Sequence, residues 1–260
     1  MFDLGEVLFY LQRLRKMKIR LQRGNQNLKL LAVWILITFA FQSDQNEFEK
    51  DILYYHIDPK NCDIQLYWKD DEGQNLKNLG GLKQFVASQQ KELLFGMNAG
   101  MFQKDLTPQG LYIQNFETLF PLDTTQGKGN FYLKPNGVFY IKNDRISVVC
   151  TTEDFKADDT IQWATQSGPM LLIDGVIHPA FKQGSQNVNI RNGVGILPDH
   201  SLVFAMSKNE INFYDFALFF KSMGCTNALY LDGLISKTYL PKKHSSQTDG
   251  WLGVMIGVVE

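Results

Sequence analysis

Short apolar runs separated by turn-forming residues recur along most of this chain, and this pattern predicts strands rather than long helices. Pro135-Asn-Gly137, Asp174-Gly175 and Pro198-Asp-His-Ser201 are turn signals between or after such runs. We expect strands over residues 53–58, 64–68, 93–97, 111–113, 131–133, 137–141, 146–149, 193–197, 202–206, 228–231 and 253–259.

Helical spacing of apolar residues occurs twice, over residues 80–91 and 212–223. In the second segment Phe216 and Phe220 lie on one face, and Asn212 is a suitable N-cap. The chain shows no internal repeat and no linker long enough to divide it. The fold class that we predict is α+β: a single domain of mostly short β-strands in mixed sheets with a few helices.

The N-terminal segment differs from the rest in charge and hydropathy. Residues 1–42 hold seven Lys and Arg against two acidic residues, and they end in a 12-residue apolar run at 30–41. A bilayer-spanning helix needs about 20 residues, so the run has the length of a signal-peptide core preceded by basic residues. We predict that 1–42 is a signal peptide or an uncleaved N-terminal anchor, with 1–16 an extension before an internal start at Met17. The domain proper is then 43–260, exported to the periplasm or the extracellular space.

Composition narrows the function. Apolar residues make up 44% of the 260, which excludes intrinsic disorder, and a net charge of −1 argues against a nucleic-acid partner bound through charge. Three widely spaced cysteines, Cys62, Cys150 and Cys225, give neither a disulfide framework nor a zinc cluster. No phosphate-binding glycine motif occurs, and we predict no cofactor. Contact with a membrane is expected only through an uncleaved N-terminal segment.

Four polar segments interrupt apolar runs, at residues 98–100, 166–169, 189–193 and 231–236. Buried polar groups must be hydrogen-bonded or used in chemistry. Asp232 follows a buried strand that would aim its carboxylate, although an Asp-Gly turn accounts for it equally well. Arg191 is suited to clamp a phosphate or carboxylate with its planar guanidinium, and a surface strand position is the alternative.

Other catalytic arrangements fit less well. Ser167 lacks the elbow motif of serine hydrolases and has no histidine nearby in the sequence. A catalytic triad would need a distant histidine, such as His178. The four histidines show no metal-binding spacing. From these residues alone we expect an exported α+β domain with a polar site around Asp232 and Arg191.

Six segments in order carry a more specific signal. They are Asn98-Ala-Gly-Met-Phe, Pro108-Gln-Gly-Leu-Tyr-Ile, Gly129-Asn-Phe-Tyr-Leu-Lys-Pro-Asn-Gly-Val-Phe, Ala164-Thr-Gln-Ser-Gly-Pro-Met-Leu, Ile190-Arg-Asn-Gly-Val-Gly and Asn227-Ala-Leu-Tyr-Leu-Asp-Gly. Together they resemble the phosphodiester glycosidase domain family, over about residues 53–259, and most of all its bacterial exported branch. The resemblance implies hydrolysis of a sugar-1-phosphodiester, with a carbohydrate or sugar-phosphate as the partner molecule. One departure is Leu234, where the family usually has the second glycine of Asp-Gly-Gly.

The resemblance also implies roles for individual residues. Asp232 would act at the anomeric carbon and Arg191 would neutralise the phosphate, which makes these two the predicted catalytic residues. The predicted substrate-binding residues are Asn98, Gln166, Ser167, Gly168, Asn227 and Ser236.

Two alternatives stay open at this point. Leu234 motivates a non-catalytic saccharide-binding or sugar-phosphate-binding protein of the cell envelope. A metal-dependent phosphodiesterase would pair Asp232 with Asp174 or Asp105, and the absence of clustered histidines weighs against it.

Overall fold

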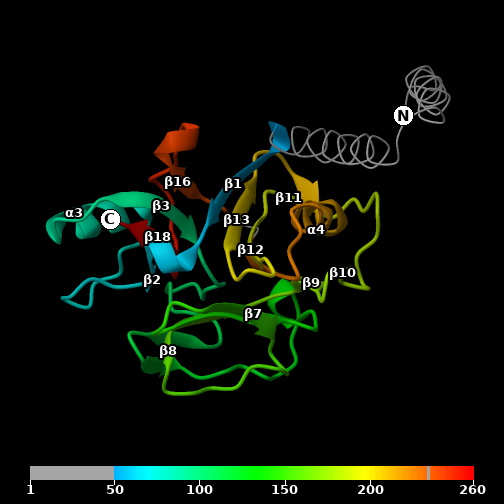
Figure 1. Ribbon diagram of the computed structural model, residues 1–260, viewed down its shortest axis with the longest axis horizontal. Coiled ribbons are helices and arrows are strands. Elements are labelled where there is room, and N and C mark those ends of the chain that lie inside the picture. The colour runs from blue at the N-terminus through cyan, green and yellow to red at the C-terminus, as the bar shows by residue number, and fades with distance from the viewer. Residues whose placement is uncertain (1–49, 233–234) are drawn as a thin grey trace, which may run out of the picture. The chain divides into compact units, whose positions relative to one another are not determined.

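A computed structural model describes residues 50–232 and 235–260, in which three β-sheets surround a shared core (Figure 1). The predicted leader, residues 1–42, and Gly233 and Leu234 lie outside these residues, so the boundary at 42/43 stays a prediction. In the described part of the chain no helix is long and apolar enough to cross a membrane.

The first sheet has six strands and carries the chemistry discussed below. Helix α4 (Phe213–Ser222) covers one of its faces with Phe216, Ala217 and Phe220. The N-cap Asn212 accepts a hydrogen bond from Asp215 N at 2.9 Å, which confirms the helix start expected from the sequence. In spatial order the strands are β1 (Ile52–Ile57), β13 (Leu202–Ser207), β12 (Asn192–Ile196), β15 (Asn227–Asp232), β9 (Met170–Ile173) and β10 (Val176–Ile177).

The second sheet has five strands, and helix α3 (Leu79–Ser88) packs on β3 and β18 through Leu79, Leu82 and Val86. This helix confirms the one expected over 80–91, although it ends three residues earlier. The order is β17 (Ser245–Ser246), β16 (Thr238–Leu240), β3 (Leu93–Asn98), β18 (Met255–Val259) and β2 (Asp63–Tyr67).

The third sheet also has five strands, and a separate two-stranded ribbon completes the strand set. The sheet order is β5 (Glu117–Phe120), β4 (Tyr112–Gln114), β8 (Ile161–Ser167), β6 (Gly137–Lys142) and β7 (Ser147–Thr151). The ribbon pairs β11 (Val188–Asn189) with β14 (Ile211–Asn212). Three short 3-10 helices lie between strands: η1 (Pro59–Asn61), η2 (Asn130–Tyr132) and η3 (Pro241–Lys243).

The aromatic residues explain how the sheets stay together. Phe204 of β13 stacks on Phe95 of β3 with ring centroids 5.3 Å apart, and it meets the edge of Phe139 of β6 at 6.0 Å. These three rings come from the three different sheets and are almost fully buried. Apolar burial of this kind is the main stabilising contribution to such a core.

The sheet-rich part of the fold-class prediction is confirmed, but the expectation of mixed sheets is wrong. Every strand pairing among the described residues is antiparallel. Parallel neighbours need long crossovers, usually helical, and the described chain has only two α-helices, of ten residues each. Hairpins such as β9–β10 and β12–β13 make the connections instead.

One local expectation also needs correction. Residues 131–133 are not a strand, because Asn130–Tyr132 forms η2, with Phe131 buried. The strands expected at 53–58 and 64–68 both form, but β1 lies in the six-stranded sheet and β2 in the five-stranded one. The turn between them therefore carries the chain from one sheet to another.

Candidate active site

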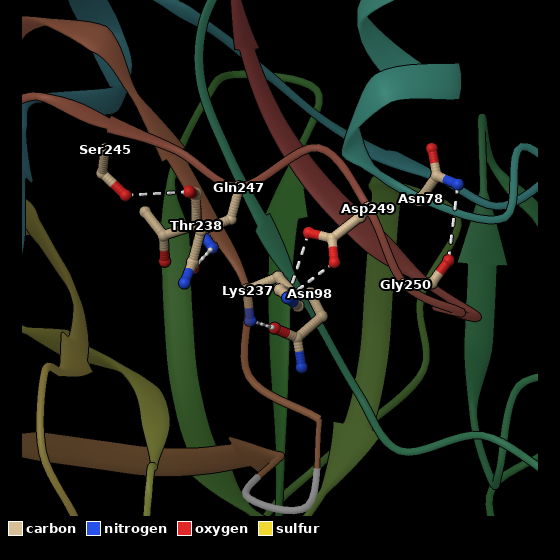
Figure 2. A network of polar contacts seen from close by, with 8 residues as sticks. All are labelled: Asn78, Asn98, Lys237, Thr238, Ser245, Gln247, Asp249 and Gly250. Atoms are coloured by element: carbon tan, nitrogen blue, oxygen red, sulfur yellow. Dashed lines mark hydrogen bonds and ion pairs between the residues drawn. The ribbon is translucent and has the colours of Figure 1, made fainter.

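Asp232 ends strand β15 and lies in a chain of hydrogen bonds that links two sheets. Its backbone N–H donates to Asn192 Oδ1 at 2.7 Å, and Asn192 Nδ2 donates to Asn98 O at 2.7 Å and to Asn98 Oδ1 at 3.0 Å. Asn98 Oδ1 also accepts from Lys237 N at 2.9 Å (Figure 2). Residues from β15, β12 and β3 thus hold the end of β15 in place.

The side-chain amide of Asn98 has a donor nitrogen, Nδ2, that is not used in this chain of hydrogen bonds. Its side chain is 0% exposed, and because Oδ1 accepts from two N–H groups, the amide orientation is fixed with Nδ2 on the other side. Among the described residues Nδ2 has no hydrogen-bond partner. An unsatisfied buried donor costs about 1–3 kcal/mol, so one that is kept in a native structure needs an explanation, of which a role in chemistry is one.

Asp232 opens onto a cavity of about 480 Å³, although only 8% of the residue is exposed. It is the only carboxylate among the described residues that line this cavity. Trp251 stands at the rim and is 62% exposed. The other polar lining groups used below are Tyr230, Asn130, Gln109 and Lys104. This combination of one carboxylate, one cation, amides and an exposed indole suits a small polar ligand with an anionic group.

Arg191 is fully buried and lies behind the cavity wall rather than in it. Its Nε donates to Ile211 O at 2.8 Å, and Nη2 donates to Asn187 O at 2.9 Å. The guanidinium carbon lies 3.6 Å from the centroid of the Phe213 ring. Burial lowers the pKa of Arg191, and its contact with Tyr230 opposes that shift. The described residues form no salt bridge with this guanidinium, so a positive charge is held in the interior by carbonyls and rings.

Tyr230 connects Arg191 to the cavity. Arg191 Nη1 donates to Tyr230 Oη at 3.3 Å, and Asn130 lies close enough to Tyr230 to act on its pKa. Burial raises the pKa of Tyr230 to about 12, and nearby Asp232 adds to this effect, while Arg191 and Asn130 oppose it. The phenol therefore stays protonated at neutral pH. Since Arg191 can only donate, the phenol proton points away from it.

Gln166, Ser167 and Gly168 lie in the interior with structural partners. Gln166 Oε1 accepts from Leu111 N at 3.0 Å and Asp123 N at 2.9 Å, and Nε2 donates to Asp123 O at 2.7 Å. Ser167 Oγ donates to Leu231 O at 2.8 Å, and a Cβ at Gly168 would meet Phe131 O at 2.9 Å. None of the three is among the residues that line the cavity.

Asn227 lies at the other end of β15 from Asp232. Its Oδ1 accepts from Asp174 N at 2.9 Å and its Nδ2 donates to Val149 O at 2.8 Å. Ser236, by contrast, is close to Asp232: its Oγ lies 3.0 Å from Asp232 O and 3.2 Å from Ile190 O. The structure thus brings Asn98, Ser236 and Asp232 together and places Asn227 elsewhere.

The small residues after Asn98 have a packing reason. Ala99 is fully buried, and a Cβ at Gly100 would collide with Thr165 Oγ1 and come within 2.7 Å of Gln166 O. The sequence-based expectation that backbone approaches closely here is confirmed. The approach brings the loop that follows β3 against β8, so that Met101 and the residues after it can line the cavity.

Among the described residues, neither a serine–histidine nucleophile nor a metal-dependent phosphodiesterase has an assembled site. The ring nitrogens of His178 lie 3.1 Å from Lys134 O and from Ala180 N, and Ser167 bonds to a carbonyl. Asp174 neighbours Asn227, at the far end of β15 from Asp232. Within residues 50–232 and 235–260, no group of three or more His, Cys, Asp and Glu is placed to hold a metal ion.

Comparison with known proteins decides the family. The model of the phosphodiester glycosidase family matches residues 91–259. The chain belongs to the phosphodiester glycosidase family. It is also 36% identical over 220 residues to an uncharacterized protein of Escherichia coli K12, covering 82% of this chain and 86% of that protein.

Two solved structures share the fold at lower identity. One is the catalytic domain of zebrafish N-acetylglucosamine-1-phosphodiester alpha-N-acetylglucosaminidase, auto-inhibited by its pro-peptide. It is 15% identical with a TM-score of 0.51, over 80% of this chain and 88% of that one. The other is a hypothetical protein from Synechocystis, 13% identical with a TM-score of 0.50, over 80% of this chain and 59% of that one.

For this member of the phosphodiester glycosidase family, sequence reasoning missed several cavity residues. Tyr230 had a usable signal, because it lies two positions before Asp232, and alternate residues of a strand share a face. Asn192, which binds the backbone of Asp232 and is not among the cavity-lining residues, lies beside Arg191 in the polar segment 189–193. Lys104, Asn130 and Trp251 lie in loops or in η2, and no periodicity identifies such residues.

Proposed function

We propose that the protein is an exported glycosidase that hydrolyses a sugar-1-phosphodiester in the cell envelope or outside the cell, releasing the sugar from the phosphate. The observation that carries the proposal is Asp232: it ends a strand, its backbone is held by Asn192, and it is the one carboxylate among the described residues that line a cavity with a lysine. Membership of the phosphodiester glycosidase family supports this chemistry.

One carboxylate is sufficient because of the leaving group. The bond that breaks joins the anomeric carbon to a phosphate oxygen, and the phosphate departs as a stable anion without needing a proton. Water supplies the hydroxyl of the released sugar, and the other product is a phosphomonoester. Positive charge develops on the sugar ring in the transition state, and the Asp232 carboxylate stabilises it.

The negative charge that develops on the leaving phosphate also needs to be stabilised by positive charge or hydrogen-bond donors. Lys104 supplies a cation from the cavity wall. Arg191 does not line the cavity and acts on the phosphate through the hydroxyl of Tyr230. Its role therefore differs from the direct contact with phosphate that the sequence predicts. A buried charge acts over a longer distance than an exposed one, because little water screens it. Tyr230 can donate its proton to a phosphate oxygen, which suits a phenol that stays protonated at neutral pH.

Side chains on the other walls suit a sugar. The exposed indole of Trp251 offers a flat apolar surface on which a pyranose ring can stack, while Gln109 and Asn130 offer amide donors and acceptors for hydroxyls. Asn98, whose Nδ2 donor is unused among the described residues, is linked to Asp232 through Asn192.

Export is supported by sequence alone. The apolar run at 30–41, with basic residues before it, has the pattern of a secretion signal. Cell fractionation with an antibody against the domain tests this part: recovery from the cytoplasm at full length would contradict it.

The activity is tested with a chromogenic sugar-1-phosphodiester and a matched pair of variants. Asp232→Asn should lose hydrolysis, whereas Asp174→Asn, the same change at the far end of β15, should keep it. Saturable binding without turnover by the wild-type chain would favour the non-catalytic saccharide-binding alternative. Loss of activity with a chelator, and recovery with a divalent ion, would favour the metal-dependent phosphodiesterase.

A further inference from the structure

A pocket of about 320 Å³, separate from the active-site cavity, is lined by residues of β2, β4, β8 and the C-terminal end of α3. None of its lining residues also lines the cavity at Asp232. Its volume lies within the range of about 300–1,000 Å³ that is usual for small-molecule sites. We call it the amide pocket, after the five amide side chains that line it: Gln65, Gln89, Gln114, Asn115 and Gln162.

Two of these amides are each held by one atom, which leaves the other atom for a ligand. Gln65 Nε2 donates to Asp63 Oδ2 at 2.8 Å, so its Oε1 is left to accept. Tyr112 Oη donates to Gln114 Oε1 at 2.9 Å, so Gln114 Nε2 is left to donate. The side chains that make no hydrogen bond to another described residue are those of Gln89, Asn115 and Gln162. The amide pocket therefore offers both donors and acceptors.

The charged residues of the amide pocket do not favour an anion. Lys69 is the only cation among the described residues that line it, and its Nζ lies 4.1 Å from the centroid of the Trp68 ring. Two acidic residues, Asp70 and Asp71, line the pocket as well. Asp70 Oδ1 accepts from Gln74 N at 2.7 Å, which fixes this carboxylate within its turn. Since the carboxylates outnumber the lysine, a ligand without negative charge is favoured.

Aromatic rings complete the lining. Tyr67 of β2 and Phe85 of α3 lie edge to face, with ring centroids 6.3 Å apart. Trp163 of β8 is paired in register with Gln114 of β4, so that an indole and an amide are neighbours on adjacent strands. The core buries most of Tyr67 and Trp163, which keeps these rings rigid and leaves only part of each for a ligand.

Trp68 keeps the amide pocket apart from the active-site cavity. The indole is buried, and its Nε1 donates to the backbone oxygen of Leu106, a cavity-lining residue, at 2.8 Å. On the side of the amide pocket the same indole is in contact with Lys69. A fixed side chain thus lies between the two sites, and each can be occupied by its own ligand.

A sugar ring presents hydroxyl groups, each of which can donate and accept, next to apolar C–H groups. Amide side chains and aromatic rings match these two kinds of surface. We propose that the amide pocket is a second saccharide site, which binds a neutral oligosaccharide apart from the cavity at Asp232. The protein then holds a neutral glycan at one place and carries its chemistry at another. This inference does not depend on the proposed hydrolysis.

Binding is tested by NMR on the isotope-labelled full chain, with cellotetraose, maltotetraose and N-acetylchitotetraose as probes. Of the four tryptophans, Trp163 lines the amide pocket and Trp251 lines the active-site cavity, so their indole N–H signals report on different sites. Trp163→Phe and Trp251→Phe assign these signals. At least one probe should shift the Trp163 signal saturably and leave the Trp251 signal in place. No saturable shift with any probe, or a shift of Trp251 without one of Trp163, would overturn the proposal.

A matched pair of double variants then tests the amides themselves. The pocket variant is Gln89→Ala with Gln162→Ala, and the control is Gln84→Ala with Gln183→Ala, two exposed glutamines outside both sites. Loss of two hydrogen-bonding side chains should weaken binding about tenfold in the pocket variant and leave the control close to wild type. The free energy of unfolding should stay the same in both, because the side chains of Gln89 and Gln162 bond to no other described residue. Equal affinities in the two variants would contradict the assignment.

Kinetics separate this inference from the proposed function. The bound oligosaccharide should not compete with a chromogenic sugar-1-phosphodiester, and the pocket variant should hydrolyse that compound with wild-type kcat and KM. Competitive inhibition by the same oligosaccharide would place it in the cavity at Asp232 and exclude a second site for it. If the wild-type chain hydrolyses no sugar-1-phosphodiester, the proposed function fails, while the NMR titration still decides whether the amide pocket binds a saccharide.

Discussion

The two ends of strand β15 make different use of the same kind of residue. At one end Asn227 is bonded through both side-chain atoms to backbone groups of Asp174 and Val149. At the other end the backbone N–H of Asp232 donates to Asn192, and Asp232 lines a cavity. The strand has six residues, so the structural end and the chemical end are five positions and about 17 Å apart.

The difference teaches how a polar residue in a buried motif should be judged. Gln166, Ser167 and Asn227 satisfy backbone groups where loops and strands meet, and each is fully engaged in doing so. Asp232 has its backbone N–H bonded to Asn192 Oδ1, and the residue lines the cavity, which none of those three does. Which atoms a residue uses for structure thus matters more than whether its motif is polar.

The substitution with the largest expected effect is Asp232→Asn, which tests whether Asp232 has a chemical role and not a structural one. The change keeps the shape and the backbone bond to Asn192, and it removes only the negative charge. We expect kcat to fall about 1000-fold with the free energy of unfolding nearly unchanged, because the charge is used in the transition state. Steady-state kinetics and urea unfolding measure the two quantities. A variant that loses stability instead would make Asp232 a structural residue like Asn227.

Tyr230→Phe tests whether the other cavity-lining residue of β15 also takes part in the chemistry. It removes the hydroxyl between Arg191 and the cavity, and we expect kcat to fall about 10- to 100-fold. Since the pKa of Tyr230 is raised to about 12, the phenol is protonated throughout pH 6–9. The ratio of wild-type to variant kcat should therefore be constant over that range. A ratio that changed steeply with pH would mean that Tyr230 titrates there.

Asn227→Ala tests the structural end. It leaves Asp174 N and Val149 O without their partner, which should cost about 1–3 kcal/mol in the free energy of unfolding. We expect kcat and KM to stay within a factor of two, as the site lies at the other end of the strand. Denaturant unfolding and kinetics on the same preparation check this. A large fall in kcat with normal stability would show that the two ends are coupled.

Trp251→Ala has the smallest expected effect. Loss of the indole removes a stacking surface at the rim, worth about 0.5–1.5 kcal/mol, and this should raise KM about three- to tenfold with little change in kcat. Trp251→Phe should restore most of the loss. An unchanged KM in the alanine variant would exclude stacking on this ring.

Several features of the fold could be predicted from the sequence because their causes are local. The N-cap at Asn212, the apolar stripe of α4 and the hairpin of β12 and β13 depend on neighbouring residues only. Which strand pairs with which depends on contacts between distant residues, such as Phe95, Phe139 and Phe204 in the core. For that reason the antiparallel sheets, and the placement of β1 and β2 in different sheets, did not follow from local patterns.

The site was predictable to a smaller extent. A carboxylate directly after a buried strand is a local signal, and it led to Asp232. The partners of Arg191 are Asn187, Ile211 and Tyr230, which lie on separate segments, so no local pattern indicates that its guanidinium is enclosed. The cavity residues Lys104 and Trp251 are brought in by loops, whose course depends on the assembled sheets.

The hydrogen-bonded chain from Asn98 through Asn192 to Asp232 has a consequence for folding. Asn98 ends a strand of one sheet, and the other two residues belong to another. The carboxylate reaches its working position only once those sheets have docked. In refolding experiments, catalytic competence should therefore return with the last step of tertiary assembly, after the secondary structure has formed.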